Sequence, residues 1–177
     1  GGTELSEKTL GIIGFGRIGQ EVAKIAIGVG MKVIFYDKFN DQANIKLDFF
    51  DGQNLSFKLK SSTFDELLNN SDYITVHIPA SKEYIINSDQ FAKMKNGVGL
   101  LNLSRGGIIN EEELIKNIES GKISFAGIDT FEGEPNPSMK ILMNSNVSLT
   151  PHIGAATGEA QDRIGVELAD KIKDILG

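Results

Sequence analysis

Three residues in the second half of the sequence have side chains that together suit the chemistry of a carboxylate-bearing substrate. They are Arg105 in NLSRGG, Glu134 in FEGEP and His152 in TPHIG. A neutral histidine accepts a proton near neutral pH, because its ordinary pKa is about 6.5. A carboxylate partner orients the ring and stabilises the imidazolium that forms. A guanidinium binds a carboxylate through two parallel hydrogen bonds, so these residues predict a site that takes a proton from a hydroxy acid.

A glycine pattern near the N-terminus predicts where a hydride-accepting cofactor would bind. GFGRIG fits G-x-G-x-x-G between an apolar run and a helical pattern. Gly14 permits a tight turn, Gly16 lets a pyrophosphate approach the main chain, and Gly19 lets helix and strand pack closely. The amides of Arg17 and Ile18 would then face the phosphates at the positive end of the helix.

Two aspartates at strand ends fit the same cofactor. Asp37 follows the glycines at about the spacing of an acid that binds the adenosine ribose. Its charge would repel a 2′-phosphate, which favours NAD over NADP, although Lys38 weakens that preference slightly. Asp129 could hold the nicotinamide carboxamide.

The candidate residues also have structural alternatives. A loop arginine or glutamate is more often a surface salt-bridge residue, and a glycine turn or a solvated strand-end acid needs no ligand.

The elements that must position these residues alternate between strand and helix. The predicted strands are 9–13, 32–37, 72–78, 98–104, 123–131 and 147–151, and the predicted helices are 17–29, 64–70, 88–95, 110–120 and 157–176. Strands that are apolar on both faces and separated by helices indicate a parallel sheet covered on both sides. We therefore expect an α/β fold, a doubly wound (Rossmann) sheet of six to seven strands. Its ligand site would lie beyond the carboxyl ends of the strands, where the polar residues stand.

Local patterns give further expectations for the helices and loops. Thr63 and Glu66 match a capping box, Asn110 is a predicted N-cap, and Gly121 is a predicted helix stop. The segment 38–60 is expected to be a loop with room for one short strand. The expected buried stripes are Ile18, Val22, Ile25 and Ala26 on the first helix, and Ala160, Ile164, Leu168, Ile172 and Ile175 or Leu176 on the last.

Composition excludes several classes of protein. The chain has 177 residues, 40% of them hydrophobic, and its net charge of −6 comes from interspersed acids and bases. A nucleic-acid-binding surface would show a basic patch, and a membrane span would need about 18 consecutive apolar residues. Without cysteine there is neither a disulfide framework nor a thiolate site, and no metal site is predicted. A cytoplasmic location is the default expectation.

Several segments, in order, resemble the NAD-binding domain of the D-2-hydroxyacid dehydrogenase family. They are GTELSEKTLGIIGFGRIGQEVAKIA, GMKVIFYD, VHIP, NLSRGGIINEEEL, SFAGIDTFEGEP and NVSLTPHIGAAT, and the resemblance covers essentially the whole chain. It implies that Arg105, Glu134 and His152 are catalytic, with Glu134 and His152 acting as a pair. It implies cofactor contacts from Gly14, Gly16, Arg17, Ile18, Gly19, Asp37, His77, Ile78, Pro79, Leu103, Ser104, Arg105, Asp129, His152, Gly154 and Ala155.

The resemblance also implies a function. The cofactor would be NAD, and the partner a small 2-hydroxy or 2-keto acid rather than nucleic acid or membrane. Within the family the segments are most similar to the 3-phosphoglycerate dehydrogenases of serine synthesis, while formate, lactate and glyoxylate/hydroxypyruvate enzymes and NAD-sensing corepressors share the frame. We expect residues 1–177 to form one dinucleotide-binding domain that pairs as a homodimer. The substrate domain would lie outside this chain, so the chain alone would bind NAD but turn over poorly.

Overall fold

A six-stranded parallel sheet forms the centre of the computed structural model, which describes residues 2–176. Its strand order is β2-β1-β5-β6-β7-β8, and every neighbouring pair is parallel. The strands are β1 (Thr9–Ile13), β2 (Lys32–Tyr36), β5 (Tyr73–Val76), β6 (Val98–Asn102), β7 (Ile123–Ile128) and β8 (Val147–Leu149). The predicted doubly wound α/β fold is confirmed. Several strands end earlier than predicted, because the residues that follow them turn away to build loops.

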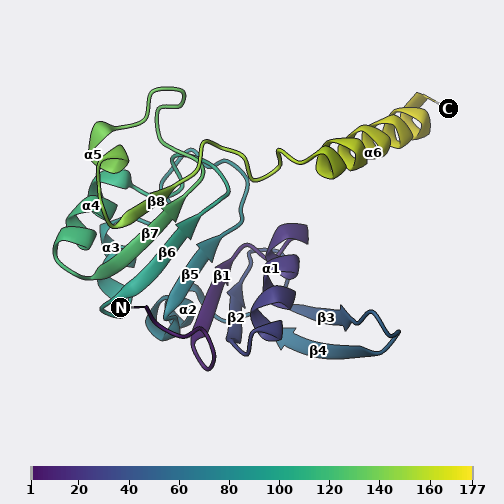
Figure 1. The fold of residues 1–177 in the computed structure, drawn as a ribbon, viewed down its shortest axis with the longest axis horizontal. Coiled ribbons are helices and arrows are strands. Elements are labelled where there is room, and N and C mark those ends of the chain that lie inside the picture. Colours follow the sequence, from purple (N-terminus) through teal and green to yellow (C-terminus); the bar gives the residue numbers. More distant parts are fainter. Residues whose placement is uncertain (1, 177) are drawn as a thin grey trace.

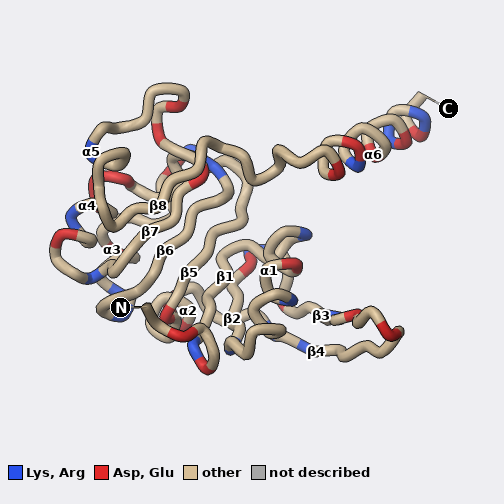
Figure 2. The backbone as a smooth tube through the Cα atoms, in the orientation of Figure 1, with Lys and Arg blue, Asp and Glu red and all other residues tan. Residues whose placement is uncertain are grey.

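Helices cover the two faces of the sheet unequally (Figure 1). The helices are α1 (Arg17–Gly28), α2 (Phe64–Asn70), α3 (Ser88–Lys93), α4 (Glu111–Glu119), α5 (Met139–Leu142) and α6 (Gly158–Leu176). Helices α2 to α4 pack over the larger apolar core, and α1 packs over a smaller core on the other face. The capping box at Thr63 and Glu66 and the N-cap at Asn110 are confirmed. Figure 2 shows that acidic and basic residues are interspersed along the chain.

The buried face of α1 matches the prediction only in part. Ala26 is buried and Val22 packs against the smaller core as predicted, whereas Ile18 and Ile25 are exposed. The other buried residues of the helix are Gly19 and Ala23. Small side chains on the inner face let the helix axis approach the sheet closely. The spacing of apolar residues alone could not show that the helix face with Ala23 and Ala26, rather than the adjacent face with Ile18 and Ile25, packs against the sheet.

The segment 38–60 is an antiparallel hairpin rather than a loop with one short strand. Strand β3 (Gln42–Asp48) pairs with β4 (Asn54–Lys60), and the hairpin extends away from the sheet beyond α1 (Figure 1). Ile45 lies in the smaller core and pairs in register with Phe57. The alternation of apolar and polar residues on both sides of Asp51-Gly52 is the signal that could have predicted it.

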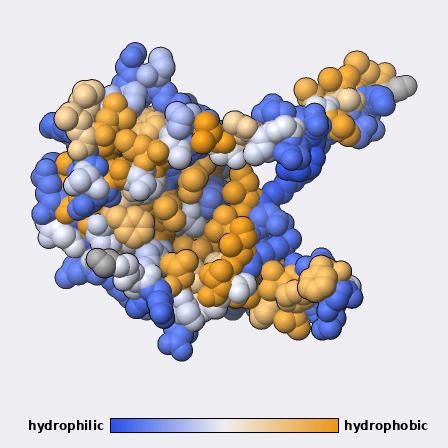
Figure 3. Space-filling model, in the orientation of Figure 1, coloured by the Kyte–Doolittle hydropathy of each residue, from blue (hydrophilic) through white to orange (hydrophobic). Residues whose placement is uncertain are grey.

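Helix α6 has no buried stripe, contrary to the prediction. It projects away from the sheet (Figure 1), and none of its residues is buried. The apolar face of an amphipathic helix indicates that something covers it, but not which element does so. The prediction of a sheet covered on both sides is also only partly right, because Phe125 on β7 is exposed. The face of the molecule drawn in Figure 3 carries several groups of hydrophobic residues. Within residues 2–176, no helix is long and apolar enough to span a bilayer.

The hairpin offers a direct test of its packing. Ile45 is 1% exposed and Leu55, on the facing strand, is 55% exposed. Replacing Ile45 with Ala should lower the free energy of unfolding by about 2–5 kcal/mol, because it leaves a cavity in the core. The matched change Leu55→Ala should alter it by about 0.5 kcal/mol or less. Chemical denaturation measures both, and equal effects would show that the hairpin does not pack as described.

Candidate active site

The predicted site residues gather at the carboxyl edge of the sheet. Strands β1 and β5 are neighbours, with β2 on one side and β6 to β8 on the other. The chain therefore reverses its direction of winding between β1 and β5, and the crevice at such a reversal is where doubly wound sheets bind ligands. The turns after β1, β2, β5, β6, β7 and β8 all open at this edge.

The first turn has the features that a pyrophosphate requires. Gly14 has φ of +89°, and a Cβ there would collide with the carbonyl oxygen of His77. A Cβ on Gly19 would collide with the carbonyl oxygen of Gly14, so helix and strand pack as closely as predicted. A Cβ on Gly16 would have nothing within 4 Å. The space over Gly16 is thus open to a ligand, and the first amides of α1 lack intrahelical acceptors.

The side chain of Arg17 is occupied by helix α6. Its guanidinium makes two hydrogen bonds with Glu167, at 2.8 Å and 3.1 Å. The hydrogen bond from Arg17 lowers the pKa of Glu167 to about 2, and Lys171 adds to the effect. This ion pair lies on the surface beside the glycine turn. Contact between Arg17 and a phosphate therefore stays a prediction.

Asp37 joins the end of β2 to the glycine turn. Its Oδ2 accepts a hydrogen bond from the Phe15 amide, and its Oδ1 accepts from the amides of Phe39 and Asn40 and from the Asn40 side chain. Burial would raise the pKa of Asp37, but these hydrogen bonds outweigh it and hold the pKa below its ordinary value. The chain's own donors thus already use this carboxylate, and its contact with ribose stays a prediction.

Exposed aliphatic side chains border the crevice. Ile18, Leu103 and Ile153 are all exposed and follow β1, β6 and β8 respectively. Ile78 is half-buried and Pro79 is exposed after β5. Apolar walls with a few polar groups are typical of sites for flat aromatic rings, so the described residues fit a dinucleotide.

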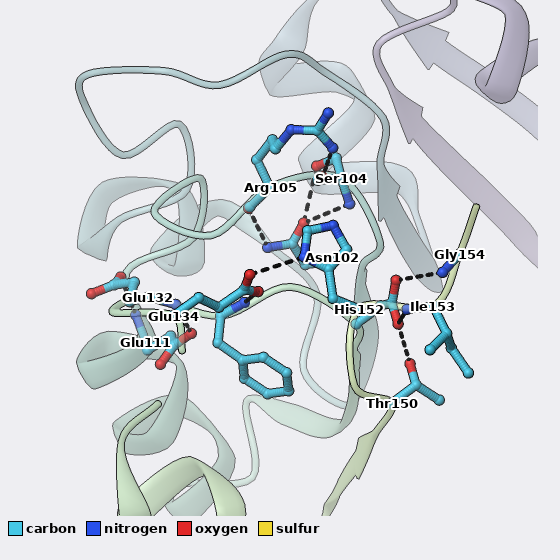
Figure 4. A network of polar contacts seen from close by, with 12 residues as sticks. Asn102, Ser104, Arg105, Glu111, Glu132, Glu134, Thr150, His152, Ile153 and Gly154 are labelled. Atoms are coloured by element: carbon cyan, nitrogen blue, oxygen red, sulfur yellow. Dashed lines mark hydrogen bonds and ion pairs between the residues drawn. The ribbon is translucent and has the colours of Figure 1, made fainter. Parts of the chain in front are cut away.

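His152 and Glu134 form a pair at this edge (Figure 4). Nδ1 of His152 lies 2.9 Å from Oε2 of Glu134, and Oε1 of Glu134 accepts a hydrogen bond from the Phe131 amide at 2.8 Å. The hydrogen bonds from Phe131 and His152 lower the pKa of Glu134. His152 has φ of +55°, a conformation that few residues other than glycine adopt.

Arg105 faces the same cavity as this pair. The cavity has a volume of about 910 Å³, and Arg105, Glu134 and His152 all line it. Asn102, at the end of β6, holds the turn: its Oδ1 accepts from the Ser104 amide and hydroxyl, and its Nδ2 donates to the Arg105 carbonyl. The guanidinium donates one hydrogen bond to the Ser104 carbonyl. The structure therefore brings together the three residues predicted to be catalytic.

Asp129 holds the loop that carries His152. Asp129 is 2% exposed, and its carboxylate accepts hydrogen bonds from the Thr150 hydroxyl and from the amides of Ile153 and Gly154. Burial would raise the pKa of Asp129, but these three hydrogen bonds outweigh it and lower the pKa. A carboxylate offers about four acceptor positions, so one remains for the predicted nicotinamide contact. Its role in the loop was not predicted.

His77 is separate from the catalytic pair. Its Nε2 lies 2.9 Å from the Thr75 hydroxyl, and its buried Nδ1 has no hydrogen-bond partner in the part of the chain that the structure describes. Burial lowers the pKa of His77, so the ring is neutral near pH 7. It does not line the cavity that holds His152.

Sequence reasoning missed the residues that support the site. Asn102 donates a hydrogen bond to the Arg105 carbonyl, and Thr150 donates one to the Asp129 carboxylate. Glu111 accepts one from the amide of Glu132, in the turn that carries Glu134. Asn102 had a readable signal, because asparagine commonly binds the backbone two residues further on in a turn. Thr150 and Glu111 act on loops distant in sequence, for which no local pattern exists.

Comparisons with known proteins agree with this geometry. A family model described as "D-isomer specific 2-hydroxyacid dehydrogenase, NAD binding domain" matches residues 1–154. Hydroxypyruvate reductase of Thermotoga maritima is 46% identical over 99% of this chain and 55% of its own length. D-3-phosphoglycerate dehydrogenase of Synechocystis sp. is 41% identical over 99% of this chain and 30% of its own length.

The fold comparison gives the same result. The solved structure of a glyoxylate reductase from Paecilomyes thermophila has a TM-score of 0.83 and 35% identity, covering 97% of this chain and 50% of that one. The chain thus spans about half the length of these relatives, or less.

Alanine substitutions at Gly16 and Gly19 distinguish a glycine that leaves space for a ligand from one that lets the helix pack against the strand. Gly16→Ala should leave the free energy of unfolding unchanged or slightly higher, because the Cβ meets no atom and restricts the unfolded chain. It should weaken NAD binding about tenfold or more, equivalent to about 1.4 kcal/mol. Gly19→Ala should instead cost about 1–3 kcal/mol of stability through overpacking. Calorimetric titration and thermal unfolding measure these effects; unchanged NAD affinity in Gly16→Ala would exclude a pyrophosphate there.

Asp129 should contribute to stability in a pH-dependent way. Because its pKa is lowered in the folded state, its contribution is complete above the ordinary aspartate pKa of about 3.9 and is lost as pH falls through the lowered value. Asp129→Asn should therefore reduce the loss of unfolding free energy as the pH falls below about 4. A parallel acid dependence in both proteins would contradict this assignment.

Proposed function

Because this chain belongs to the D-isomer specific 2-hydroxyacid dehydrogenase family and is its NAD-binding domain, we propose that the protein containing it transfers a hydride between NAD and a small D-2-hydroxy acid. The observation that carries the proposal is the 2.9 Å contact of His152 with Glu134 in a cavity that Arg105 also lines. When bound, NAD would accept the hydride from the hydroxyl-bearing carbon.

His152 is the proposed base. Its Nδ1 faces the Glu134 carboxylate at 2.9 Å, so Nδ1 carries the hydrogen and Nε2 keeps a lone pair for the substrate proton. The negative charge of Glu134 stabilises the imidazolium after proton transfer. In the reverse direction the same Nε2 returns the proton to the 2-keto oxygen.

Arg105 is the proposed anchor for the substrate carboxylate. Only one of its five N–H donors has a partner among the described residues, the Ser104 carbonyl. The remaining donors can form the bidentate contact that a carboxylate prefers. The same cation polarises the neighbouring carbonyl oxygen during keto acid reduction.

The substrate proposed first is 3-phosphoglycerate, with hydroxypyruvate or glyoxylate as the alternative. The sequence motifs favour the first, and relatives named for both phosphoglycerate and hydroxypyruvate chemistry are similar to this chain. These substrates share the 2-hydroxy or 2-keto carboxylate that His152 and Arg105 would engage, and they differ in the group at the far end.

The rest of the protein is proposed to complete the site. A substrate domain outside these residues would close the second wall of the cavity, because proton and hydride transfer need a positioned, water-poor site. The chain is about half or less of the length of its relatives, which supports this proposal. We also propose a homodimer that forms through this domain and a cytoplasmic location.

Steady-state kinetics of the full-length protein test the function. With NADH and a panel of 2-keto acids that includes 3-phosphohydroxypyruvate, hydroxypyruvate, glyoxylate and pyruvate, at least one should be reduced at ordinary enzyme rates. His152→Ala should lower kcat/KM about 10²–10⁴-fold, because it removes a general base. NAD affinity, measured by calorimetry, should stay nearly unchanged. An equal loss of NAD binding would make His152 a structural residue, and an inactive panel would favour an NAD-binding protein without this activity.

A further inference from the structure

We infer that Glu111, outside the predicted catalytic set, is a positioning residue that fixes the Phe131–Glu134 turn so that Glu134 faces His152. A role of Glu111 in catalysis rests on the proposed function. The hydrogen bonds that Glu111 makes with the turn do not depend on that proposal. Glu111 is the first residue of helix α4, and Figure 4 shows it beside Glu132 and Glu134.

Glu111 and Glu132 exchange hydrogen bonds between backbone and side chain. Oε1 of Glu111 accepts from the Glu132 amide at 2.7 Å, and Oε1 of Glu132 accepts from the Glu111 amide at 3.2 Å. Oε2 of Glu132 also accepts from the Tyr84 hydroxyl at 3.1 Å. The start of α4 is thus bonded to the turn in two directions, which fixes both the distance and the orientation of the turn.

The anchored amide lies directly within the turn that presents Glu134. The amide of Phe131, one residue earlier, donates to Oε1 of Glu134, while Oε2 of Glu134 meets His152. The turn also lies against Gly106, where a Cβ would collide with the Phe131 carbonyl oxygen. If the Glu132 amide were released, the Phe131 amide could rotate away from Glu134, and the carboxylate would lose the contact that aims it.

The burial of Glu111 is difficult to explain by a role at the helix terminus alone. Acidic residues favour the first turn of a helix, but Glu112 and Glu113 occupy that turn as well, and Glu112 is exposed. Glu111 is 6% exposed, and its Oε2 has no hydrogen-bond partner among residues 2–176. A buried carboxylate is costly unless its contacts compensate, and its side-chain contact is with the turn.

The charges that act on the pKa of Glu111 are those of two carboxylates on the turn, Glu132 and Glu134. The Tyr84 hydroxyl donates a hydrogen bond to Glu132. Burial raises the pKa of Glu111, and the charges of Glu132 and Glu134 raise it further. The negative charge of Glu111 is unfavourable at this position. The experiment must therefore test the hydrogen bond from the Glu132 amide separately from that charge.

Carboxyl ¹³C NMR of this chain, titrated with acid, reports on the turn without any turnover. Glu134 should titrate below its ordinary pKa in the wild type, because the Phe131 and His152 contacts stabilise its charge. Glu111→Ala should move that midpoint upward by about half a unit or more, since the carboxylate loses hydrogen bonds. Glu111→Gln keeps a carbonyl acceptor of the same reach, and Glu112→Ala is the matched control on the same helical turn; both should leave the midpoint in place.

Kinetics of the full-length protein provide the second measurement. Glu111→Ala should lower kcat about tenfold or more with little change in the KM for NADH. The reason is that it disorders the His152–Glu134 pair and leaves the glycine turn intact. Glu111→Gln should restore most of the rate. If Glu111→Ala does not fold, Glu111→Asp, which is one methylene too short to reach the Glu132 amide, takes its place with the same expected direction.

The outcomes separate this inference from the proposed function. A folded Glu111→Ala or Glu111→Asp protein with a lower melting temperature and an unmoved Glu134 midpoint overturns the inference, because Glu111 then serves only the fold. Equal shifts in Glu112→Ala would also overturn it. If the full-length wild type reduces no 2-keto acid, the proposed function fails, while the NMR result still decides whether Glu111 positions Glu134.

Discussion

The parallel pairing of six strands is the constraint on which the rest of the structure depends. In a parallel sheet all carboxyl ends meet at one edge, so the turns after six strands distant in sequence open onto a common crevice. The pairing of β6, β7 and β8 brings Arg105, Glu134 and His152 to one cavity. The pairing of β1 with β2 brings Asp37 to the glycine turn. No loop carries the site by itself.

Buried or half-buried carboxylates hold these turns to one another. Asp37 accepts from the Phe15 amide, Asp129 from the amides of the His152 loop, and Glu111 from the Glu132 amide. Each bond joins a side chain to a backbone amide distant in sequence, and a charged acceptor makes such bonds stronger than neutral ones. At Asp37 and Asp129 these hydrogen bonds outweigh burial, and the pKa is lowered. At Glu111 burial and the charges of Glu132 and Glu134 outweigh the single hydrogen bond, and the pKa is raised.

Local patterns predicted the parts of the fold that depend on local physics. Gly19, the capping box at Thr63 and the cap at Asn110 are each set by a few neighbouring residues, and the sequence predicted each of them. The tight turn at Gly14 was also predicted, although the His77 carbonyl, distant in sequence, adds a second requirement for glycine there. The buried face of α1 and the exposed stripe of α6 depend on which other element lies against them. Periodicity alone therefore placed Ala26 correctly on α1 but Ile18 and Ile25 wrongly, and it misplaced the stripe of α6. The hairpin at 42–60 had a readable alternation that was overlooked. The three residues of the predicted catalytic set share a cavity, but Asn102, Thr150 and Glu111, which support their loops, act through tertiary contacts that only the structure displays.

The backbone torsion of His152 restricts which side chains that position can hold. With φ of +55°, a β-branched or bulky residue would clash with its own main chain, and only glycine, asparagine, aspartate and histidine occur there with ease. Histidine is the one member of that short group whose ordinary pKa lies near neutrality. The conformation of the backbone and the chemistry of a general base therefore select the same amino acid, and the Asp129 contacts hold the loop in that conformation.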